Sequence, residues 1–541
     1  LPAILPPTRL PSFIQNSCIN LGDPVERRNA LQLLSLLLLL LVPEEYISST
    51  LKQNMSSPRT TKTEEPSLWQ LFLSPKIAFL LVSFSLGELG DGLNIFQGIY
   101  LVGIGWNEGS VGAALSLMGL TALLVQPLAG DYVDKTTIDR RFFLTTASVV
   151  TALSASTILF VRVGNTDHML MFVSKVMEGI ASSFIGPCLA ALTLATFGPN
   201  HFDHVMASNI LWGHVGSVVA AVLAGGVAYG LYPNIKYCFL VIGASALVAI
   251  IFVQYLPQGD PLMGRGFQGK VAMDENGHLE NLQGGEIDAI AGKTDVTPKV
   301  QPTASTYWEV FSDFKTCVLC ITGFFFHFAN ANVLLVLGEL MGGDDDNGAP
   351  KRSAIPLIAG AIVTAQITMA VATWAGDRLT GIGIGRKPLF MAGLLSLPIR
   401  CALIIWLRNA GEAFLLSTQV LDGIGGGLLG LIHPYLVADI TFGTGRFNVV
   451  MGLTASSFGL GATLSNFLGQ MVVEKFGHVA SLTGSLICQW SLYCCFHSCR
   501  KRRDTAGIAL PKIDTRAWPR EKSLASSRLL LEKDTLSIIH F

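Results

Sequence analysis

The sequence has few charged residues for its length. Only 14% of its 541 residues are Asp, Glu, Lys or Arg, whereas 50% are hydrophobic. A chain of this size with so little polar surface could not cover a soluble core. The formal net charge is −1, so no basic excess attracts phosphate backbones, which argues against a nucleic-acid partner. The composition therefore predicts a protein embedded in the lipid bilayer.

The sequence also lacks the patterns of disulfide, metal and cofactor sites. Its ten cysteines are scattered through apolar segments, and Cys317 and Cys320 stand at the start of one, where a chance pair is commoner than a metal site. Gly425 to Gly430 fits G-x-G-x-x-G but lies inside an apolar run, which favours a helix-packing face over a dinucleotide site. No nucleophile–base constellation is present, so we expect neither an enzyme nor a metal or other cofactor.

Long apolar runs are what the chain has in abundance. They recur from about Pro75 to about Cys499, and at roughly 20 residues per membrane-spanning helix we count about twelve, six in each half. Their centres lie near Gly87, Leu120, Ala152, Ile180, Val218, Leu247, Phe326, Ala361, Leu397, Gly427, Leu460 and Cys488. The predicted fold is an all-α polytopic membrane protein with two pseudo-symmetric six-helix bundles.

The two halves are related by an internal duplication. The acidic–glycine pair at 178–179 returns at 422–423, a shift of 244 positions. The equivalent pairs are Glu178 and Asp422, Gly179 and Gly423, Phe202 and Phe447, Glu88 and His327, and Asp91 and Asn330. Repeats of this size around membrane-embedded polar residues are typical of secondary transporters, whose binding site lies between the halves near the bilayer midplane.

Polar segments divide the chain into five parts. Residues 75–256 and 307–499 are the predicted six-helix bundles, and residues 257–306, polar and without apolar periodicity, are predicted to be a flexible cytosolic linker. Residues 1–74 contain no run of spanning length and could be a cytosolic tail, a targeting segment or a misassigned first exon. Residues 500–541 form a charged tail. Lys76, Lys315 and the basic run 500–503 place both termini in the cytosol.

Two predicted cytosolic loops carry a recurring pattern of a Gly, an Asp four positions later, a basic residue and a basic pair. The first copy comprises Gly130, Asp134, Lys135, Arg140 and Arg141, and the second comprises Asp377, Arg378, Arg386 and Lys387, with Thr373 in place of the Gly. The fourth apolar run contains Lys175, Glu178 and Gly179, where a second signature would have Arg, Gln and Gly. Together with the duplication, these loops resemble the major facilitator superfamily over about residues 75–499.

The resemblance implies two six-helix bundles that rock about a central cavity. An acidic side chain at a helix N-terminus is favoured by the helix dipole and nearby Arg by up to about 2 kcal/mol when partly buried. We therefore expect Asp134 to approach the start of the eleventh span at Arg446, and Asp377 the start of the fifth span near His201 and His204. Such contacts would latch the cytosolic side shut. Ordinary positive-inside anchoring is the alternative, which explains the basic residues but not the two Asp.

Ionisable residues near the span centres are candidates for proton and substrate binding, because each costs about 2.5 to 3.5 kcal/mol to insert. Glu88 and Asp91 share a helix face one turn apart in the first span. The full candidate set is Glu88, Asp91, Lys175, Glu178, His327, Asn330, Gln419 and Asp422.

Three alternatives remain open for these residues. Lys175 and Glu178 could instead be a structural ion pair. A packing role is commoner for a lone histidine such as His327 or His214. Arg400 is expected outside the cavity, because the ninth span is usually peripheral in the superfamily.

These features favour a secondary active transporter that moves a small organic solute, coupled to protons, by alternating access. A carboxylate removed from water takes up a proton more readily, as proton coupling requires. The residues from Trp212 to Gly216 do not match the glycine–proline signature of drug–proton antiporters. An uncoupled facilitator, and a transporter-like sensor or scaffold that binds without transporting, are the alternatives. The expected partners are the solute, protons and the bilayer, and the sequence does not indicate an oligomeric state.

Overall fold

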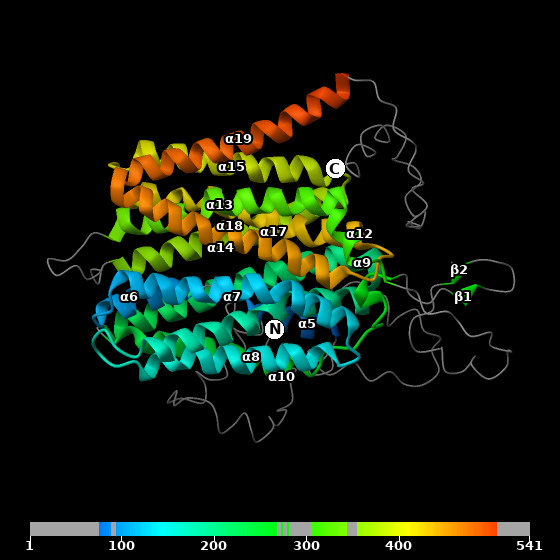
Figure 1. The fold of residues 1–541 in the computed structure, drawn as a ribbon, viewed down its shortest axis with the longest axis horizontal. Coiled ribbons are helices and arrows are strands. Elements are labelled where there is room, and N and C mark those ends of the chain that lie inside the picture. Colours follow the sequence, from blue (N-terminus) through cyan, green and yellow to red (C-terminus); the bar gives the residue numbers. More distant parts are fainter. Residues whose placement is uncertain are drawn as a thin grey trace, which may run out of the picture. The chain divides into compact units, whose positions relative to one another are not determined.

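The computed structural model describes residues 75–87, 93–232, 234–267, 272–273, 279–280, 304–342 and 354–505. Glu88, Asp91, the predicted N-terminal segment 1–74 and residues 506–541 of the predicted tail lie outside these residues. Apart from one two-stranded pairing, the described part consists of helices and their connections (Figure 1). The prediction of an all-α polytopic protein is therefore confirmed.

The helices of the first half follow one another with short connections. They are α5 (Pro75–Leu86), α6 (Asn94–Gly103), α7 (Glu108–Lys135), α8 (Arg140–Ser156), η1 (Thr157–Phe160), α9 (His168–Gly230), η2 (Ile235–Phe239), α10 (Leu240–Val253) and η3 (Met263–Arg265). Two helix starts are fixed by side-chain caps: Asn107 accepts a hydrogen bond from the amide of Ser110 at 2.7 Å, and Asp139 accepts one from the amide of Arg141 at 3.0 Å. Such caps satisfy amides that have no partner inside the helix.

The second half is built in the same way. Its helices are α12 (Tyr307–Ser312), α13 (Phe314–Gly342), α14 (Ala354–Gly381), α15 (Arg386–Leu407), α16 (Glu412–Ser417), α17 (Gln419–Thr441), α18 (Phe447–Phe476) and α19 (His478–Thr505). A capping box between Thr306 and Glu309 starts α12. Between the halves, β1 (Ala272–Met273) pairs with β2 (Leu279–Glu280) in antiparallel register.

Nine helices in the described ranges are long and apolar enough to cross a membrane. One of them, α9, has 63 residues, about 95 Å at 1.5 Å per residue, which is far longer than a bilayer is thick. Its helical geometry is interrupted at Gly198 (φ 69°, ψ 170°), directly before Pro199, so α9 supplies both the fourth and the fifth predicted spans. Helices α5 and α6 occupy the first predicted span, and α19 occupies the twelfth.

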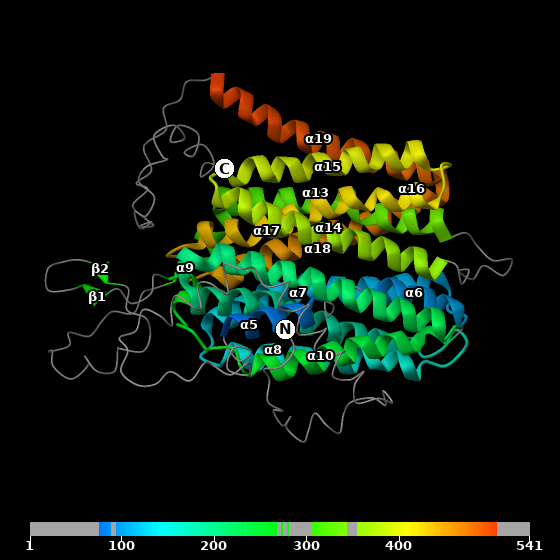
Figure 2. The ribbon, with the colours of Figure 1, turned by 180° about the vertical axis from the view of Figure 1, so that it is seen from behind.

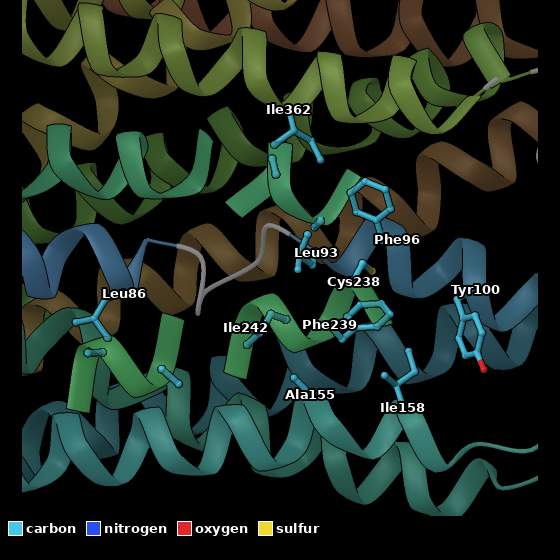
Figure 3. Close-up of a cluster of buried hydrophobic side chains, with 14 of the residues drawn as sticks. Leu86, Leu93, Phe96, Tyr100, Ala155, Ile158, Cys238, Phe239, Ile242 and Ile362 are labelled. Atoms are coloured by element: carbon cyan, nitrogen blue, oxygen red, sulfur yellow. The ribbon is translucent and has the colours of Figure 1, made fainter. Parts of the chain in front are cut away.

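The helices of the two halves lie side by side in both views (Figures 1 and 2). The halves meet chiefly where α7 packs against α18 and where α9 packs against α14. The largest buried cluster joins α5, α6, α8, η2 and α10 of the first half and also takes in Ile362 of α14 (Figure 3). Apolar packing therefore extends from the first half into the second.

The duplication seen in the sequence is visible in the packing. Gly179 lies against the carbonyl of Met118 on α7, and Gly423 lies in the same way against the carbonyl of Ala365 on α14. A Cβ added to either glycine would come within 2.6 Å of that oxygen. Gly425 packs closely on α15, as expected for a helix-packing face rather than a nucleotide site.

A second sign of the duplication lies at the junction of the halves. Phe202 and Phe447, which are equivalent in the two repeats, contact each other edge to face with ring centroids 5.8 Å apart. Both rings are fully buried. The equivalent ends of the fifth and eleventh spans therefore meet at one point of the interface.

Candidate functional site

The first buried polar group lies on α9. Lys175 Nζ is 2.7 Å from Glu178 Oε2, and the two residues are only 1% and 5% exposed. Their spacing of three residues puts both side chains on one helix face. The structure therefore places the predicted pair in contact, so that the two opposite charges neutralise each other inside the bundle.

The second buried polar group joins three helices of the second half. Arg400 on α15 is fully buried and contacts Asp422 Oδ1 on α17 at 2.8 Å. It also donates to Asn330 Oδ1 on α13 at 2.7 Å and to Gln419 Oε1 at 3.2 Å. Asn330 Nδ2 in turn donates to Asp422 Oδ1 at 2.8 Å.

This cluster corrects the expectation for Arg400. The sequence reasoning set Arg400 apart from the functional residues because its span is usually peripheral, yet it is the counter-ion of Asp422. The physical reason lies in the repeat: the position equivalent to Lys175 is occupied by the uncharged Gln419, so the cation must come from a neighbouring helix. The missing cation beside the repeated acid was a signal that a neighbouring helix supplies one, although it does not say which helix.

His327 lies in a group of aromatic side chains, one turn before Asn330 on α13. Its ring stacks on Phe458 of α18 with centroids 5.3 Å apart. The ring of His433 on α17 also contacts Phe458, with centroids 4.8 Å apart. His433 Nε2 is 2.7 Å from the hydroxyl of Thr454. The sequence reasoning identified His327 but missed Phe458 and His433, because single aromatic residues in an apolar span carry no distinguishing pattern.

One of the polar contacts that link the halves lies near the middle of their spans. His214 Nδ1 on α9 is 2.6 Å from Gln366 Oε1 on α14. From the sequence alone, His214 was expected only to pack, and Gln366 was not selected. The structure places both at the interface across which the halves would have to move.

The first predicted latch forms at the ends of α7 and α18. The Asp134 carboxylate accepts hydrogen bonds from the amide of Val449 at 3.0 Å and from Asn448 Nδ2 at 2.7 Å. Gly130 makes this approach possible, because a Cβ there would lie 2.1 Å from the carbonyl oxygen of Asn448. The acid thus binds the start of the eleventh span, which is the favoured place for a negative charge on a helix.

Arg446 has a different partner from the one expected. Its Nη1 lies 3.2 Å from Asp131, not against Asp134. Lys135 also pairs with Asp131, at 2.7 Å. Because Asp134 already receives hydrogen bonds from the helix start, the neighbouring acid one turn earlier takes the two cations.

Arg140 and Arg141 hold the segment that follows α10. Arg140 is buried and donates to the carbonyl of Pro261 at 3.3 Å, while Arg141 donates to the carbonyl of Leu256 at 3.0 Å. Partial burial disfavours the charged form of Asp139, but hydrogen bonds from Arg141 outweigh it and hold the pKa of this carboxyl below its usual range. These basic residues therefore do more than mark membrane topology.

The second predicted latch forms between α9 and α14. Asp377 Oδ2 is 2.7 Å from His204 Nδ1 at the start of the fifth span, and the hydroxyl of Tyr435 donates to Asp377 Oδ1 at 3.2 Å. Arg386 completes the contact between the halves by pairing with Asp203 at 2.6 Å and with Asp439.

The remaining predicted positions are placed as follows. Arg378 is exposed near the end of α14, and Lys387 is half-buried in the first turn of α15. Glu88 and Asp91 lie outside the described residues. Within the described part of the chain, no group of three or more His, Cys, Asp or Glu could hold a metal ion.

Comparisons with known proteins agree with this architecture. The sequence model described as Major Facilitator Superfamily matches residues 77–379, more than half of the chain. Two relatives, both named uncharacterized MFS-type transporter, come from Mycobacterium tuberculosis strains CDC 1551 / Oshkosh and ATCC 25618 / H37Rv. Each is 31% identical over 404 residues, which is 74% of this chain and 87% of the relative.

A solved structure shows the same fold. The crystal structure of a point mutant of the nucleoside transporter NupG matches with a TM-score of 0.50 at 15% identity, covering 79% of this chain and 99% of that chain. At this identity the likeness concerns the fold alone. The family match, the two relatives and the shared helical fold together show that this integral, multi-pass membrane protein belongs to the major facilitator superfamily of transporters.

Proposed function

We propose that this transporter moves a small organic solute by alternating access and couples the movement to protons. The observation that carries the proposal is the set of polar contacts between the halves at the predicted cytosolic end. Asp134 binds the start of α18, and Asp377 binds His204 on α9. The two acids come from equivalent positions of the repeat, so each half contributes one latch to the other.

Both latches are of a kind that can open without unfolding a helix. They consist of hydrogen bonds and ion pairs at helix ends, each worth about 0.5 to 3 kcal/mol. A few such contacts stabilise one arrangement of the two rigid halves relative to another. A ligand that binds the other arrangement more tightly can shift the equilibrium toward it.

The two described acids near the span centres favour Glu88 and Asp91 as the proton sites. Glu178 and Asp422 are each matched by a cation at 2.7 and 2.8 Å. Protonating either one would leave its cation without a partner inside the membrane, which is costly. We therefore assign the transported proton to the first span and a supporting role to the two neutral clusters.

The aromatic group around His327 supports a role in substrate contact. His327, Phe458 and His433 come from α13, α18 and α17, and all three side chains are only half-buried despite lying well inside the bundle. Rings of this kind offer flat apolar faces together with polar edges. A small organic solute needs both kinds of surface.

The proposal is tested by a solute screen in proteoliposomes with and without a pH gradient. Gradient-driven accumulation of a solute supports coupling, flux without accumulation indicates a facilitator, and binding without flux indicates a sensor. In the coupled case, Glu88→Gln or Asp91→Asn should abolish accumulation while counterflow at equal pH persists. If both variants accumulate solute as the unaltered protein does, the proton does not pass through the first span.

A further inference from the structure

The two ends of the segment between the halves converge on the same loop. This segment, residues 257–306, was expected to be a flexible linker. Its first end, residues 260–267, and its second end, residues 305–307, both bind residues 443–446, which connect α17 to α18. We call residues 443–446 the gate loop, since Arg446 and the adjoining start of α18 take part in the first latch.

The first end of the linker is held by both halves. On the side of the first half, the amide of Asp260 donates to the carbonyl of Ala195 at 2.9 Å, and Arg265 donates to the carbonyl of Thr136 at 3.1 Å. On the side of the second half, the amide of Gly443 donates to the carbonyl of Gly266 at 2.6 Å. This short stretch therefore bridges the interface.

The side chain of Phe267 fits against the gate loop. The ring is buried and lies over Gly445, whose backbone has a φ of 69°. A Cβ on Gly445 would come within 2.1 Å of the ring. The gate loop thus has a glycine where both the backbone conformation and the seated ring require one.

The first end of the linker also reaches the latch itself. Asn448 Nδ2, which donates to Asp134, lies 3.2 Å from the carbonyl of Gly264 as well. One amide group therefore contacts both the latch acid and the linker. A movement of the linker away from α18 would remove one of the two acceptors of Asn448.

The second end of the linker contacts the other side of the gate loop. The amide of Ser305 donates to the carbonyl of Thr444 at 2.9 Å, and Arg446 Nε donates to the carbonyl of Ser305 at 2.9 Å. The hydroxyl of Tyr307 donates to Asp131. The Arg446 guanidinium lies over the Tyr307 ring at 4.3 Å, and Lys135 Nζ lies 5.0 Å from its centroid.

We propose that the two ends of the linker are part of the cytosolic gate, with Phe267 and Tyr307 as its positioning residues. Tyr307 holds Arg446 and Asp131 together across the interface, and Phe267 fixes the gate loop that precedes α18. The linker then does more than connect the halves, because its two ends must detach from the gate loop whenever α7 and α18 separate. This inference rests on the proposed alternating access.

Hydrogen–deuterium exchange tests the proposal in nanodiscs and needs no known substrate, so its outcome is independent of the solute screen. The amides of Asn448 and Val449 report the latch directly, since both donate to Asp134. Tyr307→Ala removes both the hydroxyl that donates to Asp131 and the ring beneath the Arg446 guanidinium, and Phe267→Ala removes the buried ring over Gly445. Each variant should therefore speed the exchange of these two amides by about tenfold. Tyr307→Phe, which keeps the ring over Arg446, should give a smaller effect, and Phe267→Leu should largely restore slow exchange.

Two controls separate a gate from general loosening. Trp308→Ala removes a large ring from the same helix, but one that is 79% exposed, and should leave the two amides unchanged. The amide of Gly164, bonded to Ile104 at 2.6 Å at the opposite end, should also stay protected. Unchanged exchange at Asn448 and Val449, equal acceleration at Gly164, or an equal effect of Trp308→Ala would each overturn the proposal.

Discussion

The two halves neutralise the same buried acid by different routes. In the first half, the counter-ion of Glu178 is Lys175 on the same helix, whereas in the second half Asp422 is paired with Arg400 from a neighbouring helix. The first pair is local to α9. The second ties α13, α15 and α17 together through Asn330 and Gln419. Duplication has thus preserved the position of the acid but not the source of its partner, and in the second half this partner joins three helices.

The largest effect should follow from removing the cation that ties three helices. Arg400→Met leaves Asp422 buried without a counter-ion and also removes a donor from Asn330 and Gln419. Breaking a buried pair from one side costs about 3 to 5 kcal/mol, and we expect the upper end of this range. Thermal melting in detergent measures the loss, with the exposed Arg408→Met as the control. A melting temperature close to that of the unaltered protein would show that the cluster adds no stability.

A smaller effect is expected in the first half. Lys175→Met should destabilise the protein less than Arg400→Met, because Lys175 and Glu178 lie on the same helix, whereas Arg400 binds residues on two other helices. Lys175→Met combined with Glu178→Leu should recover folding and transport, since removing both partners of a buried pair is often neutral. Melting and flux are measured on the same preparations. A double variant that folds but does not transport would assign this pair a direct role in the cavity.

The two latches allow a second comparison of the halves. Asp134 binds backbone and side-chain donors at the start of α18, whereas Asp377 binds His204 and Tyr435. We expect Asp134→Asn to shift the protein further toward the cytosol-open state than Asp377→Asn, with about tenfold faster labelling of a cysteine introduced at Ser456. Labelling of the protein without the introduced cysteine corrects for native cysteines. Equal rates in Asp134→Asn, in Asp377→Asn and in the protein that carries only the new cysteine would reduce the loop pattern to a topology signal.

The smallest effect concerns pH. The ion pair between His204 and Asp377 exists only while His204 is protonated, so its contribution is present at acid pH and is lost at alkaline pH, where histidine is neutral. Because His204 is 52% exposed, we expect less than about 1 kcal/mol. Labelling of the cysteine at position 456 should accelerate slightly more between pH 6 and 8 than it does in His204→Gln with the same cysteine, which corrects for the pH dependence of the thiol itself. An equal acceleration in both proteins would place the titrating group elsewhere.

The sequence was sufficient to predict the helices and the helix starts that Asp134 and Asp377 contact. Spans follow from apolar length, and the partners of Asp134 and Asp377 follow from the attraction of an acid to a helix start. The pairing of Arg400 with Asp422, and the pairing of Arg446 with Asp131 rather than Asp134, could not be predicted in this way. Each depends on which neighbouring helix presents a cation, and helix packing rather than sequence spacing decides that.

The contacts of residues 260–267 were missed for a different reason. Their apolar side chains, Leu262, Met263 and Phe267, stand among glycines and charged residues without helical or strand periodicity, so the pattern indicated no packed element. Several of their contacts use backbone groups, such as the amide of Asp260 and the carbonyl of Gly266, and every residue except proline has both groups. Sequence patterns therefore carry little information about such contacts.

The central claim is that the halves open at one end while closing at the other. Spin-label distances test it most directly, with one pair of labels at the exposed positions Phe142 and Ile382 on the predicted cytosolic end, and a second pair at Val163 and Phe414 on the opposite end. Asp134→Asn should lengthen the first distance and shorten the second. If both distances stay as in the unaltered protein, or both lengthen together, the latch does not control alternating access.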